Sequence, residues 1–190
     1  MQYTPGWDWV QPIRDRNTGI WDEVSITTTG AVTVRSPYVV TKVPGVRSPE
    51  KKTQEDAFVK TSVEVENITE TPRKGVLICE TNGMRLTEQL TLSPYEKKEV
   101  QFTPLKIKNP RLWWPNGIGE QPLYDMHIYF ESDNRISDSE HLKYGIREIT
   151  SDKCPDNGGR RFFVNGQKIY MTGGNYISSD WLLRLSPERY

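Results

Sequence analysis

Ala57–Val65, AFVKTSVEV, is the stretch of sequence that decides the fold, because its side chains alternate in character. Its odd positions are apolar apart from Thr61, and its even positions are polar apart from Phe58. A period of two places the two sets of side chains on opposite faces of a β-strand. The stretch therefore predicts a strand with one face in a hydrophobic core and the other in water.

Six further candidate strands lie between residues 31 and 150, marked by alternation or by an apolar run between turns. They are Ala31–Val43, Arg73–Thr81, Met84–Leu92, Lys97–Thr103, Leu123–Glu131 and Leu142–Thr150. Asn82-Gly83 separates two of them and predicts a type I′ hairpin, since both central residues of that turn need a positive φ. Seven short strands without a long amphipathic helix predict a mostly β protein, an immunoglobulin-like antiparallel β-sandwich.

Both ends of the chain depart from this pattern. Residues 1–29 hold three of the six tryptophans but only one clear strand, Trp21–Thr27. Towards the other end, Asn165-Gly166 separates two short strands and predicts a second type I′ hairpin. Ser186-Pro187-Glu188 supplies the N-cap, N1 and first-turn residues of a helix, yet the sequence stops at Tyr190. We therefore expect a segment cut from a longer protein.

Charge and hydropathy exclude two classes of function. Lys+Arg and Asp+Glu both number 25, so the formal net charge is zero, and we expect no nucleic-acid partner because phosphate binding needs a basic excess. The sequence has no run of eighteen apolar residues, so we expect no membrane span. The first ten residues, MQYTPGWDWV, lack the basic head and apolar stretch of a signal peptide. In a segment of a longer protein, this says nothing of the parent's compartment.

Residue types that often carry chemistry are few and scattered. Cys79 lies in an apolar run and is expected to be a buried thiol, and with Cys154 it makes no disulfide framework. His127 and His141 have no partners at metal-ligand spacing, so we expect no metal and no other cofactor. Asn67-Ile68-Thr69 matches a glycosylation sequon, a pattern that often arises by chance.

Four separated motifs follow one another along the chain: Gly6–Trp9 with Asn17–Val24, Pro110–Gly117 with Gln121–Tyr124, Tyr144–Glu148, and Phe163–Ile169 with Gly173–Tyr176. Taken in this order, they resemble the motifs of glycoside hydrolase family 2, in its β-mannosidase and exo-β-glucosaminidase branches. The resemblance implies three parts. Residues 1–29 are the C-terminal tail of a jelly-roll sugar-binding domain, residues 30–150 the sandwich, and residues 151–190 the start of a (β/α)8 catalytic barrel.

The end of the chain bears on the branch of the family. Gly173-Gly174-Asn175 and Trp181–Arg184 are similar to the exo-β-glucosaminidase-like branch, and Tyr176 stands where mannosidases more often carry Trp. The resemblance implies an enzyme that removes terminal β-linked sugars from an oligosaccharide substrate. Degradation of external glycans would suit a periplasmic or secreted parent.

The family's catalytic chemistry is not expected in this chain. Retaining glycosidases use two carboxyl groups about 5–5.5 Å apart. The resemblance implies two Glu at the ends of the fourth and seventh barrel strands, the first of them preceded by Asn. The sequence holds no Asn-Glu dipeptide, and the barrel motif ends after one strand. We therefore predict no catalytic residue here and a polypeptide that hydrolyses nothing alone.

Four residues are candidates for sugar contact in the parent enzyme. The resemblance implies that Trp7 and Asp8 reach over the barrel mouth, where Trp stacks on a sugar ring and Asp accepts hydrogen bonds from hydroxyls. Alternatively, Trp7 is a core aromatic and Asp8 a turn residue. The resemblance also implies that Asn175 and Asp180 follow the first barrel strand, at the end where such barrels build active sites.

Trp113-Trp114 could be a platform for stacking sugars, but its Pro-flanked position favours packing between the sandwich and its neighbours. Two other classes of protein stay open. One is a free-standing carbohydrate-binding or adhesion sandwich. The other is an interaction domain that docks proteins through the two tryptophans.

Overall fold

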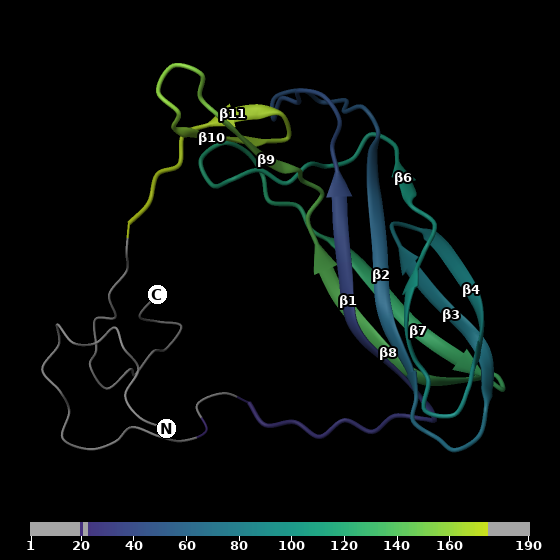
Figure 1. The fold of residues 1–190 in the computed structure, drawn as a ribbon. Helices are drawn as coiled ribbons and strands as arrows, with labels where there is room; N and C mark the ends of the chain where they lie inside the picture. The colour runs from purple at the N-terminus through teal and green to yellow at the C-terminus, as the bar shows by residue number, and fades with distance from the viewer. Residues whose placement is uncertain (1–19, 21–22, 175–190) are drawn as a thin grey trace, which may run out of the picture. The chain divides into compact units, whose positions relative to one another are not determined.

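Two antiparallel β-sheets face each other across a hydrophobic core (Figure 1). The computed structural model describes Ile20 and residues 23–174. Within this part the chain forms eleven strands and no helix, and all the strands belong to one unit, Thr28–Met171. The predicted mostly β, immunoglobulin-like sandwich is confirmed.

The first sheet has the order β1-β2-β5, with β6 paired to the other end of β2, and the second has the order β4-β3-β7-β8. The strands are β1 (Val32–Lys42), β2 (Ala57–Asn67), β3 (Arg73–Thr81), β4 (Met84–Leu92), β5 (Lys97–Gln101), β6 (Leu105–Ile107), β7 (Tyr124–Ser132) and β8 (Arg135–Tyr144). The chain changes sheet after β2, after β4 and after β6, as Greek-key sandwiches do.

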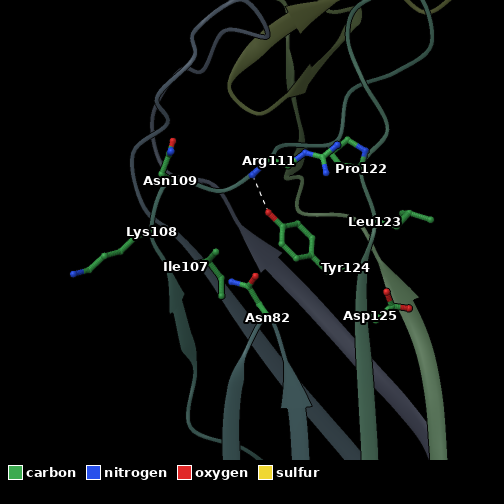
Figure 2. Close-up of a pocket in the computed structure, with 9 residues that line it drawn as sticks. All are labelled: Asn82, Ile107, Lys108, Asn109, Arg111, Pro122, Leu123, Tyr124 and Asp125. Atoms are coloured by element: carbon green, nitrogen blue, oxygen red, sulfur yellow. Dashed lines mark hydrogen bonds between the residues drawn. The ribbon is translucent and has the colours of Figure 1, made fainter.

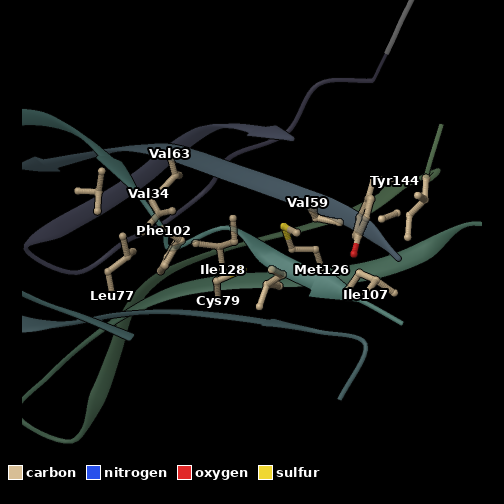
Figure 3. Packing of buried hydrophobic residues seen from close by; sticks show 14 of the residues in the cluster. Val34, Val59, Val63, Leu77, Cys79, Phe102, Ile107, Met126, Ile128 and Tyr144 are labelled. Atoms are coloured by element: carbon tan, nitrogen blue, oxygen red, sulfur yellow. The ribbon is translucent and has the colours of Figure 1, made fainter. Parts of the chain in front are cut away.

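The alternation in β2 has its predicted effect. The apolar residues of its odd positions are at most 1% exposed, and Phe58 on the other face is 36% exposed. Figure 3 shows Val63 of β2, Leu77 of β3 and Ile128 of β7 within the core. Burying one such side chain contributes about 1.5–3 kcal/mol, so the face of β2 that lines the core is a main source of stability.

Both Asn-Gly hairpins are confirmed. Asn82 and Gly83 have φ of 50° and 72°, and Asn165 and Gly166 have φ of 51° and 77°. A third turn of this kind, Asp133-Asn134, joins β7 to β8 with φ of 51° and 57°. Sequence reasoning missed this turn because it contains no glycine.

The predicted strand Leu142–Thr150 is wrong in its bounds. The structure places β8 at Arg135–Tyr144, and the chain leaves the sheet at Gly145. The inward-facing side of β8 carries Asp138, which is 8% exposed. Because a buried carboxylate interrupts the apolar alternation, the pattern hid the first half of this strand.

A second strand prediction, Trp21–Thr27, is wrong where the structure describes it. Glu23–Thr27 is not in a strand, while Trp21 and Asp22 lie outside the described residues. Val24 and Ile26 are 75% and 93% exposed. Among the described residues, their apolar side chains therefore have no core to enter.

Side chains of β8 cover the free edge of β1. The Val32 amide donates to Ser137 Oγ at 2.9 Å, and the Val34 amide donates to Asp138 Oδ2 at 2.8 Å. Arg35 forms an ion pair with the same carboxylate. Unpaired edge amides are a template for aggregation, so the buried Asp138 closes the sandwich along this side.

A small third sheet follows the sandwich, with the order β11-β10-β9. It consists of β9 (Ile149–Lys153), β10 (Arg160–Val164) and β11 (Gln167–Ile169). Val164 is 2% exposed and belongs to the same core cluster as the sandwich residues. The hairpin between β10 and β11 is thus packed against the end of the sandwich.

Candidate functional site

The four residues predicted to touch sugar, Trp7, Asp8, Asn175 and Asp180, lie outside the part of the chain that the structure describes. What the structure does describe is how the segment before Asn175 is held. Three residues far apart in the sequence, Trp113, Glu148 and Asn165, meet at the β10–β11 turn. We call these three residues the joint.

Asn165 is the centre of the joint. It is completely buried, and its Nδ2 donates to the Trp113 carbonyl at 3.0 Å while its Oδ1 accepts from the Glu148 amide at 2.9 Å. Its backbone amide donates to the Glu148 carbonyl at 2.8 Å, and its carbonyl accepts from the Arg47 amide at 2.9 Å. One turn residue therefore connects three segments of the sandwich to the β10–β11 hairpin.

Gly166 completes this contact because it has no side chain. A Cβ at this position would collide with the Gly45 carbonyl oxygen and lie 2.9 Å from Val46 Cα. At Gly83, the equivalent position of the other hairpin, a Cβ would meet nothing within 4 Å. Gly166 is thus required both by the positive φ and by a close backbone approach.

Glu148 connects the joint to the end of β1. Its carboxylate accepts from Lys42 Nζ at 2.7 Å and from the Val43 amide at 2.8 Å. Burial acts to raise the pKa of the Glu148 carboxyl, but these hydrogen bonds and the Lys42 charge outweigh it, so the pKa lies below its ordinary value. Glu148 is therefore an ionised structural carboxylate.

Trp113 packs against the segment that follows β8, residues 145–147. The Arg147 guanidinium lies over its indole, 4.3 Å from the ring centroid, a cation–π arrangement. Its amide donates to the Ile146 carbonyl at 2.9 Å. A Cβ on Gly145 would stand 3.0 Å from its Cδ1, so the backbone there fits against the indole.

Trp114 belongs to the core. It is 2% exposed, its amide donates to the Glu120 carbonyl at 2.8 Å, and its carbonyl accepts from Gln121 Nε2 at 2.9 Å. A residue with so little exposed surface has no face for a sugar to stack on. Together, the two tryptophans fit the packing interpretation of their motif.

Arg47 supports the joint from the loop after β1. It is 4% exposed, and its Nε and Nη2 donate to the carbonyls of Pro44 and Asp56 at 2.8 and 3.0 Å. Its Nη1 lies 3.8 Å from Glu55 Oε2. These contacts fold the loop so that the Arg47 amide points at Asn165.

Two shallow clefts flank the same end of the sandwich. One, of about 520 Å³, is shown in Figure 2. In it the Tyr124 hydroxyl accepts from the Arg111 amide at 2.8 Å, while the Lys108 and Leu123 side chains point away from the ring. The other, of about 410 Å³, borders Trp114. A small-molecule site requires polar side chains that converge on one point. In the cleft of Figure 2 the polar side chains do not converge in this way.

Other reactive side chains in the described residues are structural or scattered. Burial raises the pKa of the Cys79 thiol to about 11, which makes it a poor nucleophile. The His127 and His141 rings lie 6.4 Å apart. In residues 20 and 23–174, no three His, Cys, Asp or Glu side chains are arranged to hold a metal ion, and no helix could cross a membrane.

Sequence reasoning identified the motifs of the joint but missed what its residues do. Asn165 was interpreted only as a turn residue, because its side-chain partners lie 17 and 52 residues away. The available signal was the chain order of the motifs, since the Asn-Gly turn follows both Pro110–Gly117 and Tyr144–Glu148 in the sequence.

Comparison with protein families and curated proteins gives consistent matches. The family model described as glycosyl hydrolases family 2 matches residues 43–147, more than half of the chain. A mannosylglycoprotein endo-β-mannosidase of Lilium longiflorum is 39% identical over 200 residues, covering 100% of this chain and 20% of the relative. An exo-β-D-glucosaminidase of Streptomyces avermitilis is 31% identical over 189 residues, covering 94% of this chain and 20% of the relative.

Solved structures agree with these matches. The crystal structure of the Amycolatopsis orientalis exo-chitosanase matches with a TM-score of 0.73 and 26% identity, covering 85% of this chain and 18% of that chain. The chain spans about a fifth of the length of the curated relatives it matches.

Proposed function

Because the chain belongs to glycosyl hydrolase family 2, as its motifs predicted, we propose that it is the sandwich-bearing part of a longer β-glycosidase. Residues 1–29 are the tail of a sugar-binding jelly roll, residues 30–150 the spacer, and residues 151–190 the start of the catalytic barrel. The partners of the spacer are then the jelly roll and barrel of the same polypeptide, and the parent's substrate is an oligosaccharide.

The observation that carries the proposal is the joint. Four hydrogen bonds fix Asn165 to Trp113, Glu148 and Arg47. The hairpin that leads towards Asn175 is thereby held at one position on the sandwich. A spacer domain must supply such a contact, because a catalytic site loses rate steeply when its parts are misplaced by about 1 Å.

Trp7, Asp8, Asn175 and Asp180 line the sugar pocket of the parent in this proposal. Tryptophan offers an apolar face to a sugar ring, and Asp and Asn exchange hydrogen bonds with its hydroxyls. Alanine substitution of each in the full gene product should raise KM. Trp114→Ala, a core change, should instead lower stability.

The chain alone is proposed to be inactive, because the sequence offers no carboxylate pair with the context of an acid/base and a nucleophile. The purified chain should release no nitrophenol from p-nitrophenyl β-glucosaminide or β-mannoside beyond a mock preparation. Hydrolysis above that background would refute this part of the proposal.

Substrate choice follows the resemblance to enzymes that remove terminal sugars, with glucosamine favoured over mannose by Gly173-Gly174-Asn175 and Tyr176. A second candidate is endo-β-mannosidase activity, favoured by the 39% identity to the Lilium enzyme. The full gene product should be assayed on chitosan oligosaccharides, p-nitrophenyl β-mannoside and a mannosylated glycopeptide. Release of single glucosamine units supports the first candidate, and release of a mannosyl oligosaccharide supports the second.

The rival of a free-standing carbohydrate-binding module predicts a different digestion pattern. A spacer cut from its neighbours should be trimmed by protease to about the unit Thr28–Met171, because the joint protects the β10–β11 hairpin. A free-standing module should keep both ends and should bind glycans on an array. A trimmed core that binds no glycan is the outcome that our proposal expects.

A further inference from the structure

The sequon Asn67-Ile68-Thr69 stands at the end of β2, where the chain crosses from one sheet to the other. Asparagine-linked glycosylation attaches a bulky, solvated group to the side-chain nitrogen of the Asn, and modified sequons lie in surface loops. Asn67 is instead completely buried, with 0% of its surface exposed. The sequon is therefore present in the sequence, but its Asn side chain is inaccessible in the folded chain.

Every polar atom of the Asn67 side chain is already used. Nδ2 donates to the carbonyls of Thr71 and Ser93 at 2.9 and 2.8 Å, with a longer contact of 3.5 Å to Leu92. Oδ1 accepts from the Thr69 amide at 3.1 Å and from its hydroxyl at 2.8 Å. These contacts shape the β2–β3 link and tie it to the segment after β4.

The same contacts explain both polar residues of the sequon without any glycan. An amide that must donate twice and accept twice cannot be replaced by Asp, and Thr69 closes the turn. The Thr69 hydroxyl shares its single proton between Asn67 Oδ1 and the Thr71 carbonyl, 3.1 Å away, and accepts from Arg73 Nε at 3.1 Å. The turn alone thus accounts for Asn at position 67 and Thr at position 69.

Glycosylation would change the amide itself. With a polyprenyl-pyrophosphate oligosaccharide as donor, a bond forms between Nδ2 and the anomeric carbon of the sugar. The bond from that carbon to the pyrophosphate oxygen breaks, the pyrophosphate leaves with the electron pair, and Nδ2 loses one proton. One N–H remains for two carbonyl acceptors, and the sugar would need space at a fully buried atom.

We propose that glycosylation of Asn67 and the native sandwich are mutually exclusive, so the chain reaches its fold only in a compartment that leaves this sequon unmodified. The order in which the chain is synthesised allows glycosylation to act before folding, because Asn67 is made before the residues that bury it. Ser93 follows Asn67 by 26 residues, and β7 and β8 follow later still. During translocation into a lumen that contains an oligosaccharyltransferase, the sequon is exposed before its partners exist.

The test is translation of the 190-residue chain behind a cleavable secretory signal in the presence of microsomes, followed by protease digestion after detergent release. Glycosylated and unmodified chains separate on a gel and are identified by endoglycosidase treatment. The glycosylated form should be digested at least about tenfold faster than the unmodified form, because digestion follows the unfolded population. A lumen that yields only unmodified, protease-resistant chains would contradict the argument from synthesis order, because folding would then have buried Asn67 before the transferase could act. A glycosylated form as resistant as the unmodified one overturns the exclusion itself.

The matched control moves the glycan to an exposed turn. Ile136→Thr creates a sequon at Asn134, in the β7–β8 turn, where residue 136 is 56% exposed. Combined with Thr69→Val, it should give a glycosylated chain that resists protease. If Thr69→Val itself unfolds the chain, Ile136→Thr alone gives the same comparison, with mass spectrometry identifying chains modified only at Asn134.

Discussion

Replacing Asn165 by alanine should free the β10–β11 hairpin from the sandwich. The change removes both side-chain hydrogen bonds and leaves the Trp113 carbonyl and the Glu148 amide without these partners. An unpaired buried polar group costs about 1–3 kcal/mol. Because both groups are only partly buried, the two together amount to about 2–4 kcal/mol. Alanine at a φ of 51° adds about 1 kcal/mol.

Asn82→Ala is the matched control, since Asn82 has a φ of 50° before a glycine but is exposed. It carries the backbone strain without the loss of buried hydrogen bonds. The assay is hydrogen exchange of the β10 and β11 amides, which reports local opening even where the sandwich stays folded. Asn165→Ala should lower the opening free energy of these amides by about 3–5 kcal/mol, the hydrogen-bond loss and the backbone strain together, whereas Asn82→Ala should leave them unchanged.

Equal protection of the β10 and β11 amides in the two variants would refute this reasoning. It would mean that backbone bonds alone hold the hairpin. Loss of protection throughout β2 and β7 in Asn165→Ala would mean instead that the joint and the sandwich open as one unit.

Three further changes test neighbouring parts of the account. The pKa of Glu148 is lowered in the folded state. Its contribution to stability is therefore present above the ordinary pKa of about 4.3 and is lost as the pH falls through the folded value. In urea unfolding at a series of pH values, Glu148→Gln should lose less stability in acid than the wild type. Gly166→Ala should cost about 1–3 kcal/mol more than Gly83→Ala in urea unfolding, because only at Gly166 does the new Cβ collide with the Gly45 carbonyl. Cys79, with its pKa raised to about 11 by burial, should react with a thiol reagent at pH 8 only as fast as the sandwich opens, and labelling at the rate of a free thiol would contradict its burial.

Local patterns predicted the parts of the fold whose cause is local. The alternation in β2 determines which of its faces is buried, and each Asn-Gly pair produces the turn that its backbone needs. Strand β8 was misplaced because its inward face carries Asp138, whose partner is the edge of β1. That contact spans 104 residues, and no window of sequence contains both ends.

The candidate site was predictable in its location but not in its bonding. The motifs around Trp113, Arg147 and Asn165 stood out through the family resemblance, and the structure brings them together. That Asn165 donates to one motif and accepts from another depends on how the third sheet packs on the sandwich. The predictions for Trp7 and Asn175 fall outside the described residues.

The most direct test of the central claim is the kcat/KM of the full gene product with p-nitrophenyl β-glucosaminide, p-nitrophenyl β-mannoside and a mannosylated glycopeptide, for the wild type, Asn165→Ala and Asn82→Ala. If the sandwich positions the barrel through the joint, the wild type cleaves at least one substrate and Asn165→Ala lowers its kcat/KM at least about tenfold. Asn82→Ala should stay near the wild-type value. A wild type that cleaves none of the three substrates, or equal values for the two variants, would contradict the account.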